Sequence, residues 1–126
     1  MTERDYMTKL SKLFNASGKG VFTIMADTGG VSHRKGYDAF IIYKGRHIAV
    51  EGKAGNGRLK EHQVKALADA ITHGAGVFVI RFISAGASFI RFDPTEDNEE
   101  QYRDVTWGAL KDPAVIENLL DWGIGK

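Results

Sequence analysis

The 126-residue sequence predicts a single α/β domain, in which strands form a central sheet and helices pack against it. Three observations lead to this prediction. Apolar residues recur with helical spacing in three separate segments, and two apolar runs are joined by the short turn Lys44-Gly45. A third apolar run, residues 76–83, is too continuous for a half-exposed strand, so we expect it at the centre of the sheet. The expected order is helix, strand, hairpin, helix, strand, strand, helix.

The first helix is predicted over residues 2–14, where Thr2 is a suitable N-cap and Glu3 and Asp5 lie in the first turn. Its apolar stripe consists of Tyr6, Leu10, Leu13 and Phe14. A turn-rich break at residues 15–20 should end the helix, and residues 21–26 should form a strand before a Gly29-Gly30 loop.

The hairpin occupies residues 36–53, and a second helix is predicted over residues 59–73. The helical spacing of that second segment is set by Val64, Leu67, Ala68 and Ile71, and His73-Gly74 provides a stop signal. After the central strand, residues 88–92 are expected to form one more strand.

The C-terminal quarter begins with residues 93–104, which are acidic and lack periodicity, and we interpret them as a solvated loop. Asp112-Pro113 is a typical helix start, and the final helix should end at Gly123. The apolar face of this helix comprises Val115, Ile116, Leu119, Leu120 and Trp122. Trp107 and Trp122 are interpreted as core or subunit contacts and not as platforms for nucleic-acid bases.

Composition excludes several functional classes. The chain has no cysteine, which excludes disulfides, thiolate zinc sites and cysteine nucleophiles and agrees with a reducing cytoplasm, the expected location. No apolar run reaches the length of a membrane span, and the first residues lack the apolar core of a signal peptide. The four histidines form no His-x-x-x-His pair, and His33 alone, close to Asp38 in sequence, is a candidate for catalysis.

The charges are distributed unevenly along the chain. Residues 1–65 contain twelve Lys or Arg and six Asp or Glu, whereas residues 66–126 contain five and ten, so a net charge of +1 conceals a basic first half. A polyanion would be steered toward that half. The residues proposed to contact it are Arg34, Lys35, Arg58 and Lys60.

The hairpin carries the residues with the clearest chemistry. Strand periodicity places Glu51 and Lys53 on one face, and Asp38, at the start of the preceding strand, should lie beside Glu51. Two carboxylates suit Mg²⁺ or Mn²⁺, and a nearby ammonium can orient a water or neutralise charge that develops on a phosphate. The alternative is a surface hairpin whose charges only solvate it.

The segment from Gly36 to Gln63 resembles the VRR-NUC branch of the PD-(D/E)XK nucleases, which belong to the restriction endonuclease-like superfamily. The matching positions are Gly36, Asp38, Glu51, Lys53, Gly57, Arg58, Leu59 and Gln63. The resemblance implies an αβββαβ core with a central mixed sheet and helices on both sides, followed here by an additional C-terminal helix. It also implies that the Gly52 carbonyl is a third metal ligand and that Gln63 supports the site by hydrogen bonds.

Many members of this family take a further carboxylate from the first helix. Glu3 is the best candidate for that role, with Asp5 and Asp27 behind it, although Glu3 and Asp5 also suit a helix N-terminus. The chain departs from the family pattern at three positions. Tyr37 replaces the usual proline, Gly52 replaces an apolar residue, and Lys60 replaces a capping serine.

These features lead to two functional hypotheses. The first is a Mg²⁺- or Mn²⁺-dependent endonuclease that hydrolyses DNA phosphodiesters, for which branched or flapped DNA is one form of target. The second is a non-catalytic nucleic-acid-binding module that retains the nuclease fold, motivated by the departures at Tyr37 and Gly52. The resemblance extends to Holliday junction resolvases, where cutting two strands requires two sites, so we also expect a homodimer, with the apolar last helix as a candidate contact.

Overall fold

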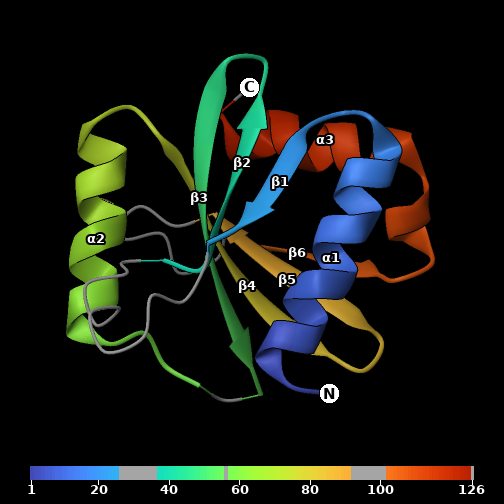
Figure 1. Ribbon diagram of the computed structural model, residues 1–126, viewed down its shortest axis with the longest axis horizontal. Coiled ribbons are helices and arrows are strands. Elements are labelled where there is room, and N and C mark those ends of the chain that lie inside the picture. The colour runs from blue at the N-terminus through green and yellow to red at the C-terminus, as the bar shows by residue number, and fades with distance from the viewer. Residues whose placement is uncertain (26–36, 56, 92–101, 126) are drawn as a thin grey trace.

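The computed structural model describes residues 1–25, 37–55, 57–91 and 102–125, and these residues form one six-stranded sheet (Figure 1). The strands lie in the order in which they occur along the chain. All neighbouring pairs are antiparallel except β3 and β4, which are parallel. The strands are β1 (Val21–Ile24), β2 (Ala39–Tyr43), β3 (Arg46–Ala54), β4 (Gly76–Ile83), β5 (Gly86–Arg91) and β6 (Tyr102–Thr106).

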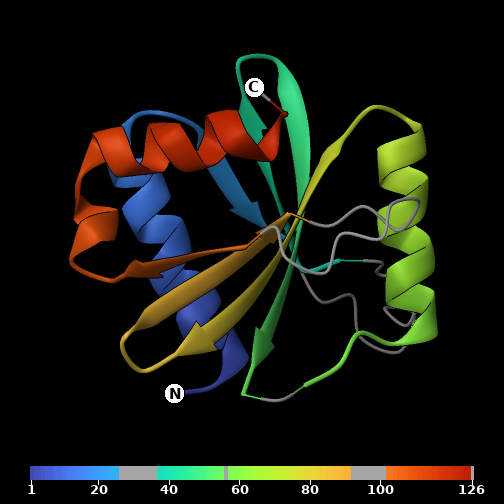
Figure 2. The ribbon, with the colours of Figure 1, turned by 180° about the vertical axis from the view of Figure 1, so that it is seen from behind.

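Helices cover both faces of the sheet. Helices α1 (Glu3–Ser17) and α3 (Pro113–Gly123) lie on one face, and α2 (Glu61–Thr72) lies on the other, as Figures 1 and 2 show from opposite sides. A short 3-10 helix, η2 (Ala109–Lys111), leads into α3. Helix α2 forms the crossover between β3 and β4, which a parallel pair requires. The predicted mixed sheet flanked by helices, with an additional C-terminal helix, is confirmed.

The two faces of the sheet are covered unequally. The core under α1 and α3 is large and includes Met7, Leu10, Phe14, Ile116, Leu119 and Leu120 together with side chains of five strands. The core under α2 contains only Ala49, Leu67, Val77 and Val79 as buried members. The α2 face therefore has the thinner apolar cover, and the candidate site described below lies on it.

Helix α1 begins as predicted but ends three residues later. Thr2 and Asp5 form a capping box: Asp5 N–H donates to Thr2 Oγ1, and Thr2 N–H donates to Asp5 Oδ2. The predicted break from residue 15 is wrong, because Asn15 remains helical and its carboxamide binds both the N–H and the C=O of Phe22. This amide fixes the start of β1 against the helix. Helix α1 ends at Gly18, which has a φ of 70°.

The predicted hairpin of β2 and β3 is confirmed. Lys44 and Gly45 both have positive φ, 49° and 74°, as the two central residues of a type I′ turn require. This tight turn sets the register, in which Ala39 lies opposite Val50. The register decides which residues meet at the far end of the hairpin.

Two sequence-based boundaries need correction. Residues 102–104, predicted as part of a loop, belong to β6, which pairs with β5 through its backbone. Four of the five β6 side chains are exposed, so this edge strand has no apolar pattern by which to recognise it. Residues 93–101 lie outside the described part of the chain. Helix α2 begins at Glu61 and not at Leu59, which packs near the sheet beside the small core.

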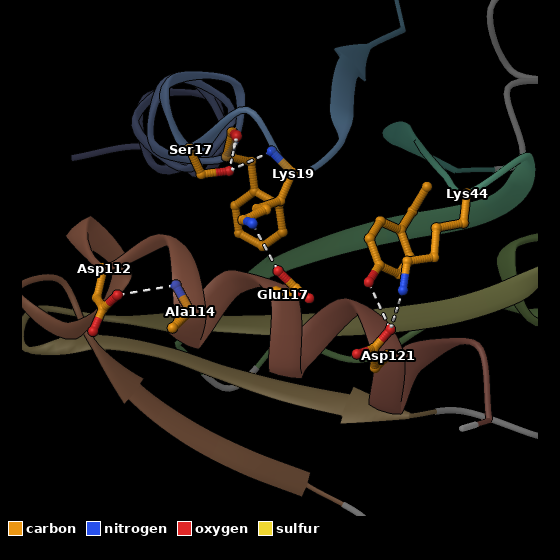
Figure 3. A network of polar contacts seen from close by, with 9 residues as sticks. Ser17, Lys19, Lys44, Asp112, Ala114, Glu117 and Asp121 are labelled. Atoms are coloured by element: carbon orange, nitrogen blue, oxygen red, sulfur yellow. Dashed lines mark hydrogen bonds and ion pairs between the residues drawn. The ribbon is translucent and has the colours of Figure 1, made fainter.

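Helix α3 begins and ends where predicted, and Asp112 Oδ1 accepts a hydrogen bond from the Ala114 N–H at 2.9 Å. Figure 3 shows how polar side chains attach this helix to the rest of the domain. Lys19 Nζ lies 2.8 Å from Glu117 Oε2, and Asp121 Oδ1 accepts hydrogen bonds from Tyr43 and Lys44 at 2.6 and 3.4 Å.

The apolar face of α3 is used within the domain itself. Ile116, Leu119 and Leu120 are at most 2% exposed, and Val115 and Trp122 pack partly buried against the same core. Most of this face is therefore used within the domain, and a contact of the partly exposed Val115 and Trp122 with a partner stays a prediction. The tryptophans are packing residues as predicted, since Trp107 stacks on Tyr6 and Trp122 contacts Phe78. Within the described ranges, no helix is long and apolar enough to cross a membrane.

Candidate functional site

Asp38 and Glu51 meet where β2 begins. Because Ala39 pairs with Val50, the preceding residue, Asp38, lies opposite Glu51. Asp38 N–H donates to the Val50 carbonyl at 2.9 Å, and Asp38 Oδ2 accepts the N–H of Gly52 at 2.9 Å. The Asp38 carboxylate thus provides an acceptor for the β3 backbone one step beyond the first residue of β2, Ala39.

Glu51 is a buried carboxylate with one unsatisfied oxygen. Its side chain is 2% exposed, and Oε1 accepts a hydrogen bond from Gln63 Nε2 at 2.8 Å. Oε2 is buried and receives no hydrogen bond from any described residue. Burial, followed by the negative charge of Asp38, raises the pKa of Glu51 from 4.5 to about 8, and the Lys53 ammonium opposes this shift. An unsatisfied buried carboxylate oxygen beside a second carboxylate suits a cation.

Lys53 lies on the same face of β3 as Glu51, as strand periodicity predicts. Its residue is 8% exposed, and Nζ is 3.6 Å from Glu51 Oε1. At this distance the pair is an ion pair without a close hydrogen bond, and an ammonium can donate to more than one acceptor. The site therefore presents the Glu51 carboxylate and the Lys53 ammonium on one face of β3, with the charge of Asp38 close enough to act on Glu51.

Gln63 connects this group to the start of α2. Its Oε1 accepts the N–H of Lys60 at 2.8 Å while its Nε2 donates to Glu51. The Lys60 N–H, at the N-cap position, therefore has a partner although Lys60 has no side-chain oxygen to act as a cap. The departure at Lys60 consequently leaves the helix start intact, and Gln63 is fixed at both ends of its amide.

Gly52 faces the opposite side of the sheet, toward α1. A Cβ atom at this position would lie 2.8 Å from Met7 Sδ and 2.9 Å from Phe82 Cε2. The apolar volume that another side chain would supply is filled here by Met7 and Phe82. The departure at Gly52 is thus accommodated by the packing of α1 and does not leave a cavity.

The loop after Lys53 is held by Arg81, which is not among the residues that the sequence predicts for the site. Arg81, the β4 partner of Lys53, donates from Nη1 to the carbonyls of Gly57 at 2.7 Å and Gly55 at 3.3 Å. Gly57 also lies close to the aliphatic part of Lys53, since a Cβ there would be 3.5 Å from Lys53 Cδ. An arginine inside the otherwise apolar run of residues 76–83 was the available signal.

Arg81→Met is expected to release this loop. Losing two charge-assisted hydrogen bonds at a partly exposed position should lower the free energy of unfolding by about 1–2 kcal/mol. Amide hydrogen exchange at Gly55 and Gly57 should accelerate, whereas exchange within α1 should not change. Lys65→Met, an exposed cation on α2, is the control, and equal exchange in the two variants would contradict the role given to Arg81.

The three candidates for a further carboxylate, Glu3, Asp5 and Asp27, differ in their surroundings. Asp5 is committed to the capping box, and Asp27 lies outside the described residues. Glu3 Oε1 accepts the N–H of Ala54 at 2.9 Å, and Glu3 and Asp38 line one cavity of about 140 Å³. Among the described residues, no three Asp, Glu or His side chains lie close enough to hold a metal together. Among the described residues, Asp38 and Glu51 are thus the acidic pair that forms the candidate site.

The basic candidates are placed only in part. Arg58 and Lys60 are exposed on the segment between β3 and α2, and the Lys60 N–H donates to Gln63. Arg34, Lys35 and His33 lie outside the described residues. Of the other histidines, His47 packs against Phe40 and Tyr37, on the same face of the sheet as Glu51.

Without divalent cations, the free energy of unfolding is expected to fall as pH rises from about 5 to about 8. An unfolded glutamate releases its proton near pH 4.5, whereas folded Glu51 retains it to about pH 8, so ionisation in place destabilises the fold. The expected slope approaches roughly 1 kcal/mol per pH unit. Denaturant unfolding in EDTA measures it, and the same slope in Glu51→Gln would show that another group is responsible.

Comparisons with known proteins agree with the fold. No family model matches the chain. A curated relative, ribonuclease 3 of Desulforamulus reducens, is 36% identical over 86 residues, which is 67% of this chain and 33% of that protein, so the chain spans about a third of its length. The structure of Hjc, a Holliday junction resolvase of Archaeoglobus fulgidus, matches with a TM-score of 0.55 at 18% identity and covers 93% of this chain and 96% of that one. The predicted nuclease-like α/β fold class is thereby confirmed.

Proposed function

We propose that this protein is a metal-dependent endonuclease that hydrolyses DNA phosphodiester bonds. The observation that carries the proposal is Glu51, a buried carboxylate beside Asp38 with an oxygen that no described residue satisfies. A structural carboxylate of this kind would be expected to have its hydrogen bonds complete. The likeness of the fold to a Holliday junction resolvase and the sequence match to a ribonuclease point in the same direction.

Asp38 and Glu51 would hold Mg²⁺ or Mn²⁺, hard cations that prefer carboxylate oxygens. When bound, the cation would supply positive charge to the phosphate and lower the pKa of a nearby water. The Gly52 carbonyl is the proposed third ligand. In an extended strand it points to the same side as the Gly52 N–H, which binds Asp38.

The remaining roles belong to side chains of this chain. Lys53 would orient the attacking water or stabilise charge on the phosphate, because its ammonium is held beside Glu51 and can donate to more than one acceptor. Gln63 keeps the Glu51 carboxylate in one orientation. Glu3 is the proposed additional acid, and Arg34, Lys35, Arg58 and Lys60 are the proposed DNA contacts. We also assign the chain to the VRR-NUC branch on the motif from Gly36 to Gln63.

A cleavage screen tests the proposal. Purified protein is incubated with linear, nicked, flapped and four-way DNA, and with duplex RNA as a separate arm, in Mg²⁺, Mn²⁺ or EDTA. We expect cleavage of at least one DNA substrate that depends on the cation. Cleavage of RNA alone would correct the substrate, and no cleavage in any arm would count against the enzyme.

Calorimetry with Mn²⁺ distinguishes the enzyme from a module that only binds nucleic acid. The enzyme should give heat that is lost in Asp38→Asn and Glu51→Gln. A binding module without the metal site should give no such heat, while its affinity for DNA would fall with salt according to the number of phosphates neutralised.

A homodimer remains our prediction, since cutting two strands of a branched target requires two sites. Most of the α3 face that suggested it is buried within the domain, which leaves the partly exposed Val115 and Trp122, or other surface, for a dimer contact. Sedimentation equilibrium at micromolar concentration should show a mass twice the 13.9 kDa of the chain. A 13.9 kDa species that still cuts both strands would contradict the prediction.

A further inference from the structure

A second cavity lies on the same face of the sheet as Glu51 and Lys53. It has a volume of about 420 Å³ and is formed between the C-terminal end of α2 and the start of β3. We call it the Tyr37 cavity; its walls include Tyr37, Arg46, His47, Ala70, His73 and Gly74. Its described lining contains one guanidinium, two imidazoles and a phenol, and no acidic side chain.

Contacts between three parts of the chain hold the polar groups of the Tyr37 cavity in place. The His47 ring stacks on Phe40, with centroids 5.0 Å apart and planes inclined by 18°. The Tyr37 ring meets His47 edge-on at 6.2 Å, and its hydroxyl lies 3.4 Å from His47 Nε2. Arg46 donates from Nη2 to the Gly74 carbonyl at 3.2 Å, which spans the mouth between β3 and α2. Tyr37, one of the departures from the family pattern, is therefore a built part of this cavity.

The chemistry of the lining fits a segment of single-stranded nucleic acid. Flat aromatic and imidazole rings provide surfaces on which a base can stack, and a guanidinium binds phosphate. An acidic wall would repel the backbone, and the described lining has none. The half-exposed rings of Tyr37, Phe40 and His47 are therefore better suited to a nucleotide than to a cation.

The position of the Tyr37 cavity relates it to the carboxylates. His47 precedes Glu51 by four residues on the same strand and shares its face, so the two lie roughly 13 Å apart. A stacked nucleic-acid strand covers that distance in three to four nucleotides at about 3.4 Å each. Tyr37 adjoins Asp38 directly, so the wall of the cavity leads into the site.

We propose that the Tyr37 cavity is a DNA subsite, which holds a nucleotide three to four positions from the scissile phosphate. His47 and Tyr37 contact the base, and Arg46 contacts the phosphate. This inference rests on the proposed function, since the distance is counted from Asp38 and Glu51. It adds a specificity element on the α2 face, away from the carboxylates.

Binding measurements without cleavage test the subsite. The affinity for a fluorescein-labelled flapped DNA is measured by anisotropy in EDTA, so that no substrate is consumed. His47→Ala should weaken binding about fivefold or more, as loss of a base-stacking platform does. Arg46→Gln should weaken binding and reduce the log-log salt slope by about 1. The controls are Tyr102→Ala, an exposed ring on the edge strand β6, and Lys111→Gln, an exposed cation in η2, and neither should change the affinity.

Photocrosslinking gives a readout that a folding defect would not imitate. Oligonucleotides carrying 5-iododeoxyuridine at single positions are irradiated with the wild-type protein, and the modified residue is identified by mass spectrometry. Crosslinks to Tyr37 or His47 from positions three or four nucleotides from the cut are expected. Crosslinks confined to other residues would overturn the subsite.

The two proposals fail in different ways. If the wild type cuts DNA but Arg46→Gln and His47→Ala bind it as well as their controls do, the subsite is wrong and the enzyme stands. If the wild type binds DNA without cutting it, and both variants bind DNA more weakly than their controls do, the cavity binds DNA and the proposed activity is wrong. No DNA binding by the wild type would overturn the subsite directly.

Discussion

Glu51→Gln is expected to abolish cation-dependent DNA cleavage while leaving the fold intact. Glutamine has the size of glutamate and can still accept the hydrogen bond from Gln63, but it brings no negative charge to hold a cation. Several kcal/mol of transition-state stabilisation should be lost, which corresponds to a fall in rate of roughly 10³-fold or more.

Thermal melting and Mn²⁺ calorimetry accompany the rate measurement for Glu51→Gln. At pH 8 without cation the variant should melt no lower than the wild type, because it removes a buried group that resists ionisation. Glu117→Gln, a change of the same kind at a partly exposed glutamate that pairs with Lys19, is the matched control and should keep full activity. Cleavage by Glu51→Gln at the rate of that control would exclude Glu51 from the site.

Lys53→Met is expected to separate catalysis from cation binding. The methionine fills the space of the lysine stem, so the loss is confined to the ammonium 3.6 Å from Glu51 Oε1. We expect kcat to fall by about 10²–10³-fold, as when a preorganised donor is removed from a developing anion. Affinity for Mn²⁺ should hold or rise at pH 8.5, because a competing positive charge is gone.

Lys53→Arg provides the comparison for Lys53→Met. It restores the charge but not the geometry of a point donor, so partial recovery of kcat is expected at most. If Lys53→Met lost Mn²⁺ binding and melted at a markedly lower temperature, the ammonium would have a structural role in neutralising the buried Glu51. The KM for DNA should change little, since Lys53 is almost completely buried.

The sequence predicted those parts of the fold that depend on local chemistry. Thr2 and Asp112 start their helices, the Lys44-Gly45 turn sets the hairpin register, and strand alternation places Lys53 beside Glu51. Each of these follows from side-chain type and spacing within a few residues. The pairing of Asp38 with Glu51 required only the additional knowledge of where the hairpin turns.

The failures share another cause, which is dependence on distant partners. β6 exists because β5 offers a free edge, and its own side chains carry no signal for a strand. Asn15 extends α1 because Phe22 supplies both a donor and an acceptor for its amide. Met7 and Phe82 occupy the space that a side chain at position 52 would need. Arg81 binds the carbonyls of Gly55 and Gly57 and so holds their loop. Except for the contact of Asn15 with Phe22, which spans seven residues, these contacts lie outside the window that periodicity examines.

The crossover through α2 implies an order of assembly for the site. On either side of it lie three strands joined by antiparallel pairs. Among the described strands, backbone pairing joins the two halves only between β3 and β4, where Ile48 pairs with Gly76. Local hairpins close with less loss of chain entropy than this long connection, so they should form first. Asp38 and Glu51 would then be neighbours while still in water, and Glu51 would behave as an ordinary acid. Its raised pKa should arise only when the halves dock, which makes that titration a reporter of the last folding step.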